Sequence, residues 1–230
     1  CVAPRSCAIG IATPVLGDFV SMTNHPWSFS IRELQAALAL DRLVVINDFT
    51  ALALALPLLQ TSELRRIGPG KAKAGAPHPI LGPGTGLGVS GLIPHGTALV
   101  PLVCEGGHVT LSATNEAEDA VIVKLRQRFG HASAERALSG PGLVNLYQAC
   151  CEIAGRTPRA LEPEDVTTLA LGDVDPMCRR AVELFFALLG TTAGNLALTL
   201  GALGGVFIGG GIVPRLTALM EHSQFRARFE

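Results

Sequence analysis

The feature that most constrains this chain is a run of glycines at alternate positions, Gly82, Gly84, Gly86 and Gly88. Closely spaced glycines let backbone N–H groups approach phosphate oxygens without obstruction by side chains. The hydroxyl of Thr85 could add a further donor. The run therefore predicts either a phosphate-binding turn between two strands or a purely structural glycine turn. It lacks the Gly-Lys-Ser/Thr ending of a P-loop.

A literal Gly-x-Gly-x-x-Gly stands at residues 86–91, with Glu105 nineteen residues after Gly86. This is the spacing of a dinucleotide-binding fingerprint, which has to open a helix. The residues that follow, 89–96, have the pattern of a strand and a turn instead. A Rossmann-type oxidoreductase is therefore the weakest of the functions considered.

Short apolar runs alternate along the chain with segments of helical periodicity. This alternation predicts α/β layers, with a hairpin-like section around the glycine run. The predicted strands cover 7–12, 20–23, 43–46, the residues entering Gly82, 99–103 and 206–208. The predicted helices follow caps at Ser30, Thr50, Asn115 and Asp175, cover 142–155, and open once more at Pro214.

One long segment, 184–214, contains no charged side chain. Its length would suffice to cross a bilayer, which takes about 20 residues. Thr191, Thr192, Asn195 and Thr199, however, form a polar stripe near helical spacing, and glycines interrupt the second half of the segment. We therefore expect a buried helix followed by a buried strand, and no membrane partner.

Composition narrows the classes of function. Apolar residues make up 48% of the 230 residues, and 18 basic against 19 acidic side chains leave a net charge of −1. This balance is typical of a folded protein and lacks the basic excess of nucleic-acid-binding proteins. The chain begins at Cys1 and shows no pattern of a signal peptide. Its six cysteines form no Cys-x-x-Cys, so we expect reduced thiols and a cytoplasmic protein.

Asn47 and Asp48 directly follow the apolar run 43–46. Ligands of open α/β sheets gather where parallel strands end. A carboxylate at such a place can accept a proton from a substrate hydroxyl. Asp48 could equally help to cap the helix that follows, and the residues alone leave these two roles open.

A further constellation combines Glu105 and His108, separated by two glycines, with Glu135 further along. Carboxylate oxygens accept hydrogen bonds from hydroxyls, and imidazole can donate or accept, so this set suits a polyol. The alternatives are a buried Glu–His pair that satisfies itself and a zinc site. Zinc requires three or four ligands, which no His-Glu-x-x-His or cysteine cluster supplies, so we predict no metal site.

Seven stretches, in this order and over nearly the whole chain, resemble glucokinases of the bacterial type, in the hexokinase–actin–Hsp70 ATPase superfamily. They are 22–27 (MTNHPW), 46–50 (INDFT), 82–89 (GPGTGLGV), 105–109 (EGGHV), 133–136 (SAER), 138–147 (LSGPGLVNLY) and 204–215 (GGVFIGGGIVPR). Each motif alone has low specificity, but seven in register are specific. The resemblance implies a two-lobed α/β fold of the ribonuclease-H-like, actin-like ATPase type.

The resemblance also implies ATP-dependent phosphorylation of glucose at its 6-hydroxyl, with Asp48 as general base. Mg²⁺ would arrive with ATP, and no tightly bound cofactor is expected. The positions that match the family's sugar side are Thr23, Asn24, Asn47, Asp48, Glu105, His108 and Glu135. Those that match its nucleotide side are Gly84, Thr85, Gly86, Gly88, Gly209, Gly210 and Gly211.

The family opens with a strand bearing an Asp-x-Gly-Gly-Thr phosphate loop, and residues 1–230 contain no such segment. We therefore expect an incomplete small lobe at 1–58 and a large lobe at 59–230, without the C-terminal return to the small lobe. We also expect the chain by itself to be inactive. A homodimer is compatible with the resemblance. The alternative is a non-catalytic sugar-sensing module of the related repressor/kinase family, whose Cys-rich zinc signature is missing here.

Overall fold

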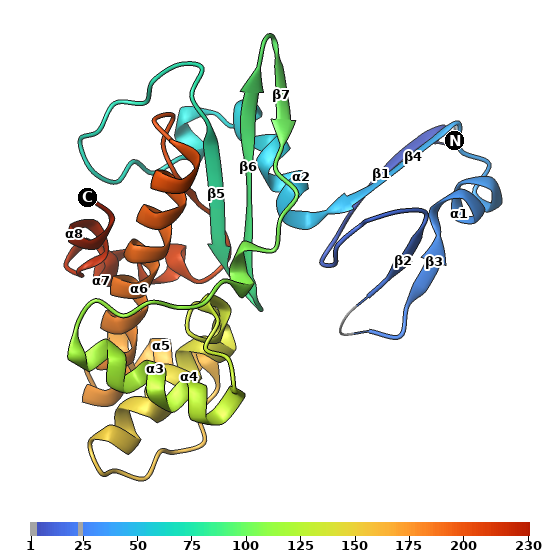
Figure 1. The fold of residues 1–230 in the computed structure, drawn as a ribbon. Helices are drawn as coiled ribbons and strands as arrows, with labels where there is room; N and C mark the ends of the chain where they lie inside the picture. Colours follow the sequence, from blue (N-terminus) through green and yellow to red (C-terminus); the bar gives the residue numbers. More distant parts are fainter. Residues whose placement is uncertain (1–3, 23–24) are drawn as a thin grey trace. The chain divides into compact units, whose positions relative to one another are not determined.

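The computed structural model describes residues 4–22 and 25–230 (Figure 1). The chain divides into two compact units. Unit 1 comprises Cys1–Arg65 and Ser90–Val103, and unit 2 comprises Arg66–Val89 and Cys104–Glu230. Thr23 and Asn24, which the resemblance assigns to the sugar side, lie outside the described residues.

The central feature of unit 1 is a parallel strand pair. β1 (Ser6–Ile11) pairs with β4 (Arg42–Asn47), so the apolar run 43–46 is the parallel strand that we predicted. α2 (Asp48–Ala55) begins where β4 ends. Pro57 lies in the short turn η1 (Leu56–Leu58) and ends the helix, as expected.

The other strand pair of unit 1 is antiparallel and leads into α1. It consists of β2 (Phe19–Ser21) and β3 (Ser28–Ser30), and α1 (Ile31–Ala37) follows β3 directly. A short turn, η2 (Thr61–Glu63), comes later in the chain. Ser30 Oγ accepts from the Glu33 amide at 3.1 Å and donates to the Asp18 carboxylate at 2.6 Å, which confirms Ser30 as a cap. The buried core of this part is Ile11, Val20, Leu43 and Val45.

A mixed sheet follows, with the strand order β7-β6-β5-β8. β6 (Leu87–His95) begins in unit 2 and pairs antiparallel with β7 (Ala98–Pro101) in unit 1. In unit 2, β5 (His78–Pro83) pairs in parallel with β8 (Phe207–Ile208), which is half-buried rather than fully buried as expected. The glycine motif at 86–91 thus enters a strand and not a helix, which confirms that it is no dinucleotide fingerprint.

Helices make up most of unit 2 (Figure 1). The longest is α6 (Pro176–Leu200), which Asp175 caps through bonds to the amides of residues 177 and 178. α4, α5, α7 and α8 pack against α6, and α3 packs against α4. Their bounds are α3 (Glu116–Phe129), α4 (Gly140–Ile153), α5 (Pro163–Leu171), α7 (Thr217–Glu221) and α8 (Phe225–Phe229).

Most of these helices match the predicted segments, and two, α5 and α8, do not. Asn115 caps α3 and Gly130, with φ of +75°, ends it, as predicted. Pro214 opens only a 3₁₀ turn, η5 (Val213–Leu216), before α7. α5 was not predicted at all, because its nine residues carry only two buried positions, Val166 and Ala170.

α6 carries the charge-free segment, and α8 lies directly on it. Among the described helices, α6 alone is long and apolar enough to span a membrane, and more than half of its apolar window is buried inside the protein, as in a core helix. Phe185 and Phe186 on α6 are completely buried. A Cβ at Gly190 would overlap the carbonyl oxygen of Phe225, so α8 can approach α6 this closely only because residue 190 is glycine.

Candidate functional site

Asn47 lies at the junction of β4 and α2 in unit 1. Its Oδ1 accepts hydrogen bonds from the amides of Phe49 at 2.9 Å and Thr50 at 3.1 Å, so Asn47 is the cap of α2. The prediction that Thr50 caps this helix is therefore wrong. The helix starts earlier, because Asn47 keeps an extended backbone while its short side chain turns back onto the amides, as good N-cap residues do.

Asp48 is the first residue of α2, and its side chain is exposed. Its Oδ1 accepts from the Phe49 amide at 2.9 Å. A carboxylate at a helix N-terminus is stabilised by the positive end of the helix dipole. Since Asn47 supplies the cap, the exposed carboxylate of Asp48 suits a role as proton acceptor at the end of the strand.

The glycine run in unit 2 forms the tight turn between β5 and β6. The Gly84 amide donates to the Gly86 carbonyl at 2.8 Å and closes the turn. The Gly84 carbonyl in turn accepts from the amide of Gly140, the first residue of α4, at 2.8 Å. Gly88 is the second residue of β6. The turn is therefore held from outside by the start of a long helix.

The glycine segment 209–211 lies against the end of β5. The Gly209 amide donates to the Leu81 carbonyl at 2.9 Å. Gly210 has φ of +81°, and a Cβ there would overlap the carbonyl oxygen of Pro83. Only glycine fits this position. These contacts place the two predicted nucleotide-side segments side by side, although they are far apart in sequence.

A cavity of about 320 Å³ lies beside these segments, and Gly84, Thr85 and Gly211 line it. The remaining lining residues are Gly140, Pro141, Leu143, Pro163, Glu164, Thr167, Ile212 and Arg215. Sequence reasoning missed these residues, several of which belong to α5. Pro163 at the first helical position, followed by Glu164 and Asp165, is the signal that could have revealed this helix.

Glu105 directly precedes the short turn η3 (Gly106–His108), and His108 is the last residue of this turn. His108 Nε2 and Glu105 Oε2 are 3.8 Å apart, and both side chains are more than half exposed. The alternative of a buried, self-satisfied pair is therefore wrong. Within residues 4–22 and 25–230, no three His, Cys, Asp or Glu side chains converge as a metal site would require.

The η3 turn rests on the first residues of β6. A Cβ at Gly106 would lie 2.8 Å from Val89 Cγ1, and one at Gly107 would overlap the Leu87 carbonyl oxygen. Cys104 adds an anchor, because its Sγ donates to the Val89 carbonyl at 3.4 Å and burial raises the pKa of this thiol. The glycines between Glu105 and His108 thus serve close packing against β6.

Glu135 belongs to the turn η4 (Ala134–Arg136), which contacts η3. Its Oε2 accepts from the Leu87 amide at 2.9 Å. A Cβ at Gly86 would overlap the same oxygen, so the glycine makes room for the carboxylate. Unit 2 therefore brings Glu105, His108 and Glu135 to the exit of the glycine turn.

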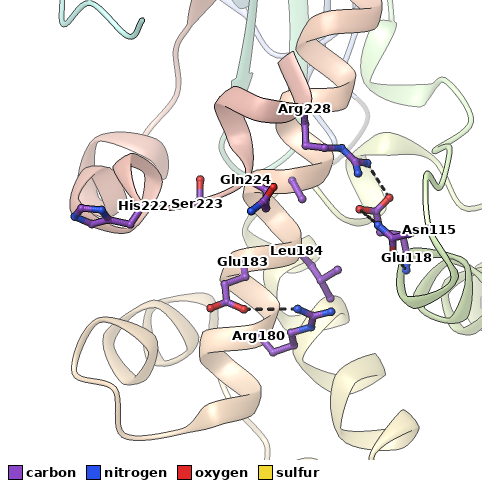
Figure 2. A pocket seen from close by; sticks show the side chains of 10 residues that line it. Asn115, Glu118, Arg180, Glu183, Leu184, His222, Ser223, Gln224 and Arg228 are labelled. Atoms are coloured by element: carbon purple, nitrogen blue, oxygen red, sulfur yellow. Dashed lines mark hydrogen bonds and ion pairs between the residues drawn. The ribbon is translucent and has the colours of Figure 1, made fainter. Parts of the chain in front are cut away.

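A second cavity, of about 430 Å³, contains none of the predicted site residues (Figure 2). Arg228 Nη2 contacts Glu118 Oε2 at 3.0 Å there, and Arg180 Nη1 contacts Glu183 Oε2 at 3.7 Å. The charged groups of this cavity thus pair with one another. No ligand is needed to balance them.

The sequence matches the family model described as Glucokinase over residues 1–230. It is 56% identical over 227 residues to Glucokinase of Aromatoleum aromaticum, which covers 99% of this chain and 69% of that protein. It is 53% identical over 223 residues to Glucokinase of Chromobacterium violaceum, which covers 97% and 64%. The chain thus spans about two thirds of the length of these curated relatives.

Solved structures show the same fold. A crystal structure of glucokinase from an Antarctic psychrotroph superimposes with a TM-score of 0.88 at 36% identity, covering 96% of this chain and 69% of that one. A ROK family glucokinase from Streptomyces griseus, in complex with glucose and AMPPNP, superimposes with a TM-score of 0.59 at 16% identity, covering 87% and 62%. At that identity the second likeness concerns the fold alone.

Proposed function

The chain belongs to the glucokinase family, and from this membership we propose that the protein transfers the γ-phosphoryl group of ATP to the 6-hydroxyl of glucose. The observation that best supports this proposal is the bond between Glu135 Oε2 and the Leu87 amide. It puts a carboxylate suited to a polyol directly on a glycine turn suited to phosphate. A kinase of sugars needs these two kinds of group next to each other.

Asp48 acts as the general base in this proposal. The 6-hydroxyl oxygen attacks the γ-phosphorus, its proton passes to the Asp48 carboxylate, and the bond from the γ-phosphorus to the β–γ bridging oxygen breaks to release ADP. Phosphoryl transfer proceeds with little covalent chemistry from the protein, so positioning and charge dominate. Mg²⁺ enters with ATP as part of this substrate.

The sugar contacts divide between donors and acceptors. Asn47 uses Oδ1 to cap α2, which leaves its Nδ2 to donate to a sugar hydroxyl. Glu105 and Glu135 accept from hydroxyls, and His108 can do either. Thr23 and Asn24 complete the proposed set. A sugar with one hydroxyl reversed leaves a polar group unpaired, which a site of this kind rejects strongly.

The nucleotide lies along the glycine segments in this proposal. The amides of Thr85, Gly86 and Gly88 approach the phosphates, Gly84 closes the turn through its own amide, and Gly209, Gly210 and Gly211 border the nucleoside. The 320 Å³ cavity lined by Gly84, Thr85 and Gly211 falls within the range of small-molecule sites.

Several features of the whole protein stay predictions. They are the division into lobes at 58/59, the incompleteness of the small lobe within 1–230, the inactivity of these residues alone, the homodimer and the cytoplasmic location. The glucokinase homologues support the coarser statement, namely a mixed α/β fold shared with sugar kinases.

An assay of the full-length protein tests the proposal. Purified protein is supplied with ATP and glucose, and glucose 6-phosphate is detected with a coupled dehydrogenase; galactose serves as the comparison sugar. Calorimetry measures glucose binding in parallel. Product from glucose and not from galactose supports the proposal. Glucose binding without product would establish the sugar-sensing alternative, and neither binding nor product would exclude glucose as the ligand.

A further inference from the structure

Residues 135–140 hold the glycine turn at both ends. At its exit, the Leu87 amide donates to the Glu135 carboxylate at 2.9 Å. At its entry, the Gly84 carbonyl accepts from the Gly140 amide at 2.8 Å. A segment of six residues thus fixes two points of the turn that are three residues apart.

Ser139 links the two ends of this segment. It is 2% exposed. Its Oγ donates to the Glu135 carbonyl at 2.8 Å and accepts from the Gly142 amide at 3.0 Å. One buried hydroxyl therefore ties the backbone of the sugar-side carboxylate to the first turn of α4, which carries Gly140.

We propose that Ser139 is a positioning residue, which sets Glu135 and the phosphate-binding turn in one fixed geometry for phosphoryl transfer. This inference rests on the proposed function. Ser139 touches neither substrate in it and acts through Glu135 and Gly140. Without the hydroxyl, the Glu135 carbonyl loses its donor and the Gly142 amide loses its acceptor. No side-chain hydrogen bond then couples the position of Glu135 to that of Gly140. Misplacement of reacting groups by about 1 Å can reduce rates by about 100-fold.

The competing interpretation is that Ser139 is only a helix cap. Asp175 offers a matched control, because it caps α6 through the amides of Met177 and Cys178 and lies outside the proposed machinery. S139A and D175A each lose a cap, whereas S139T keeps both an acceptor and a donor. A role in helix capping alone predicts the same behaviour for S139A and D175A.

The experiment compares these variants in the full-length protein at a temperature where all are folded. For S139A we expect kcat to fall about 10-fold or more, whereas D175A and S139T should each change kcat by about twofold or less. Equal losses of kcat in S139A and D175A would overturn the inference, as would an S139A enzyme within twofold of the wild type.

A second measurement does not depend on activity. Hydrogen exchange at the Leu87 amide reports on its bond to Glu135 directly. We expect S139A to accelerate this exchange about 10-fold, an effect in line with the loss of a hydrogen bond to a charged group, and D175A to leave it unchanged. Unchanged exchange in S139A would overturn the inference. If the wild type does not phosphorylate glucose, the proposed function fails, and the exchange rate still decides the role of Ser139.

Discussion

Arg228 Nη2 lies 3.0 Å from Glu118 Oε2, and this ion pair joins α8 to the first turn of α3 across 110 positions of sequence. Glu118 is 2% exposed, and Thr114 donates to the same oxygen through its amide and its hydroxyl. Burial acts to raise the pKa of Glu118, but the bonds from Thr114 and the Arg228 charge outweigh it and hold the pKa below its ordinary value.

Removing the arginine should destabilise the protein strongly. We expect R228A to lower the free energy of unfolding by about 3 kcal/mol or more, because it leaves a buried carboxylate without its counter-charge. R226A is the matched control: Arg226 lies on the same helix and pairs with Glu230, but both of these side chains are about half exposed. Its cost should stay below about 1 kcal/mol. Urea unfolding measures both, and equal costs would contradict the argument.

The same pair predicts an acid dependence of stability. A folded pKa below the unfolded value of 4.5 means that the contribution of Glu118 is present above pH 4.5 and is lost as the pH falls through the folded pKa. The wild type should therefore exceed E118Q in stability at pH 7, and the difference should shrink below pH 4.5. A difference that stays constant down to pH 3 would show that ionised Glu118 makes no such contribution.

Gly86 should matter for sugar affinity rather than for folding. A Cβ at this position would overlap the end of the Glu135 side chain, which can move, so G86A displaces the carboxylate and leaves the backbone in place. We expect glucose affinity, measured by calorimetry, to fall about 10-fold or more, as for a lost hydrogen bond to a charged group. G70A is the control, since a Cβ there meets open space. Wild-type affinity in G86A would argue against Glu135 as a sugar ligand.

Asp48 should separate chemistry from binding. We expect D48N to lower kcat by about 10²–10⁴-fold, the range typical of a lost general base, while glucose binding changes only a few-fold. D41N replaces another aspartate of unit 1, whose partner is the exposed Arg5, and should leave kcat unchanged. A D48N enzyme with substantial kcat would remove Asp48 from the mechanism.

The predictable parts of the structure are those set by neighbours in sequence. The run 43–46 is apolar throughout, so it formed a parallel strand that ends at Asn47, and the alternate glycines formed the turn between two strands. Caps at Ser30, Asn115 and Asp175 were predictable because a cap bonds to amides two or three residues away. Local chemistry is sufficient at these positions.

The unpredicted parts depend on contacts between distant segments. The sequence predicts Thr50 as the cap because its hydroxyl can accept from amides, and only the bend at the end of β4 gives this role to Asn47 instead. The bond from Leu87 to Glu135 spans 48 positions and leaves no periodic trace in the sequence. Likewise, Glu164, Thr167 and Arg215 meet at one cavity only after α5 and η5 have folded.

The contact of Gly190 with Phe225 also has an evolutionary consequence. Every replacement of glycine adds a Cβ, and any Cβ at position 190 would push away the helix that carries Arg228. No other residue can therefore replace glycine conservatively at position 190, and we expect glycine to be retained there during evolution. Gly70, where an added methyl group meets open space, should by contrast be free to vary.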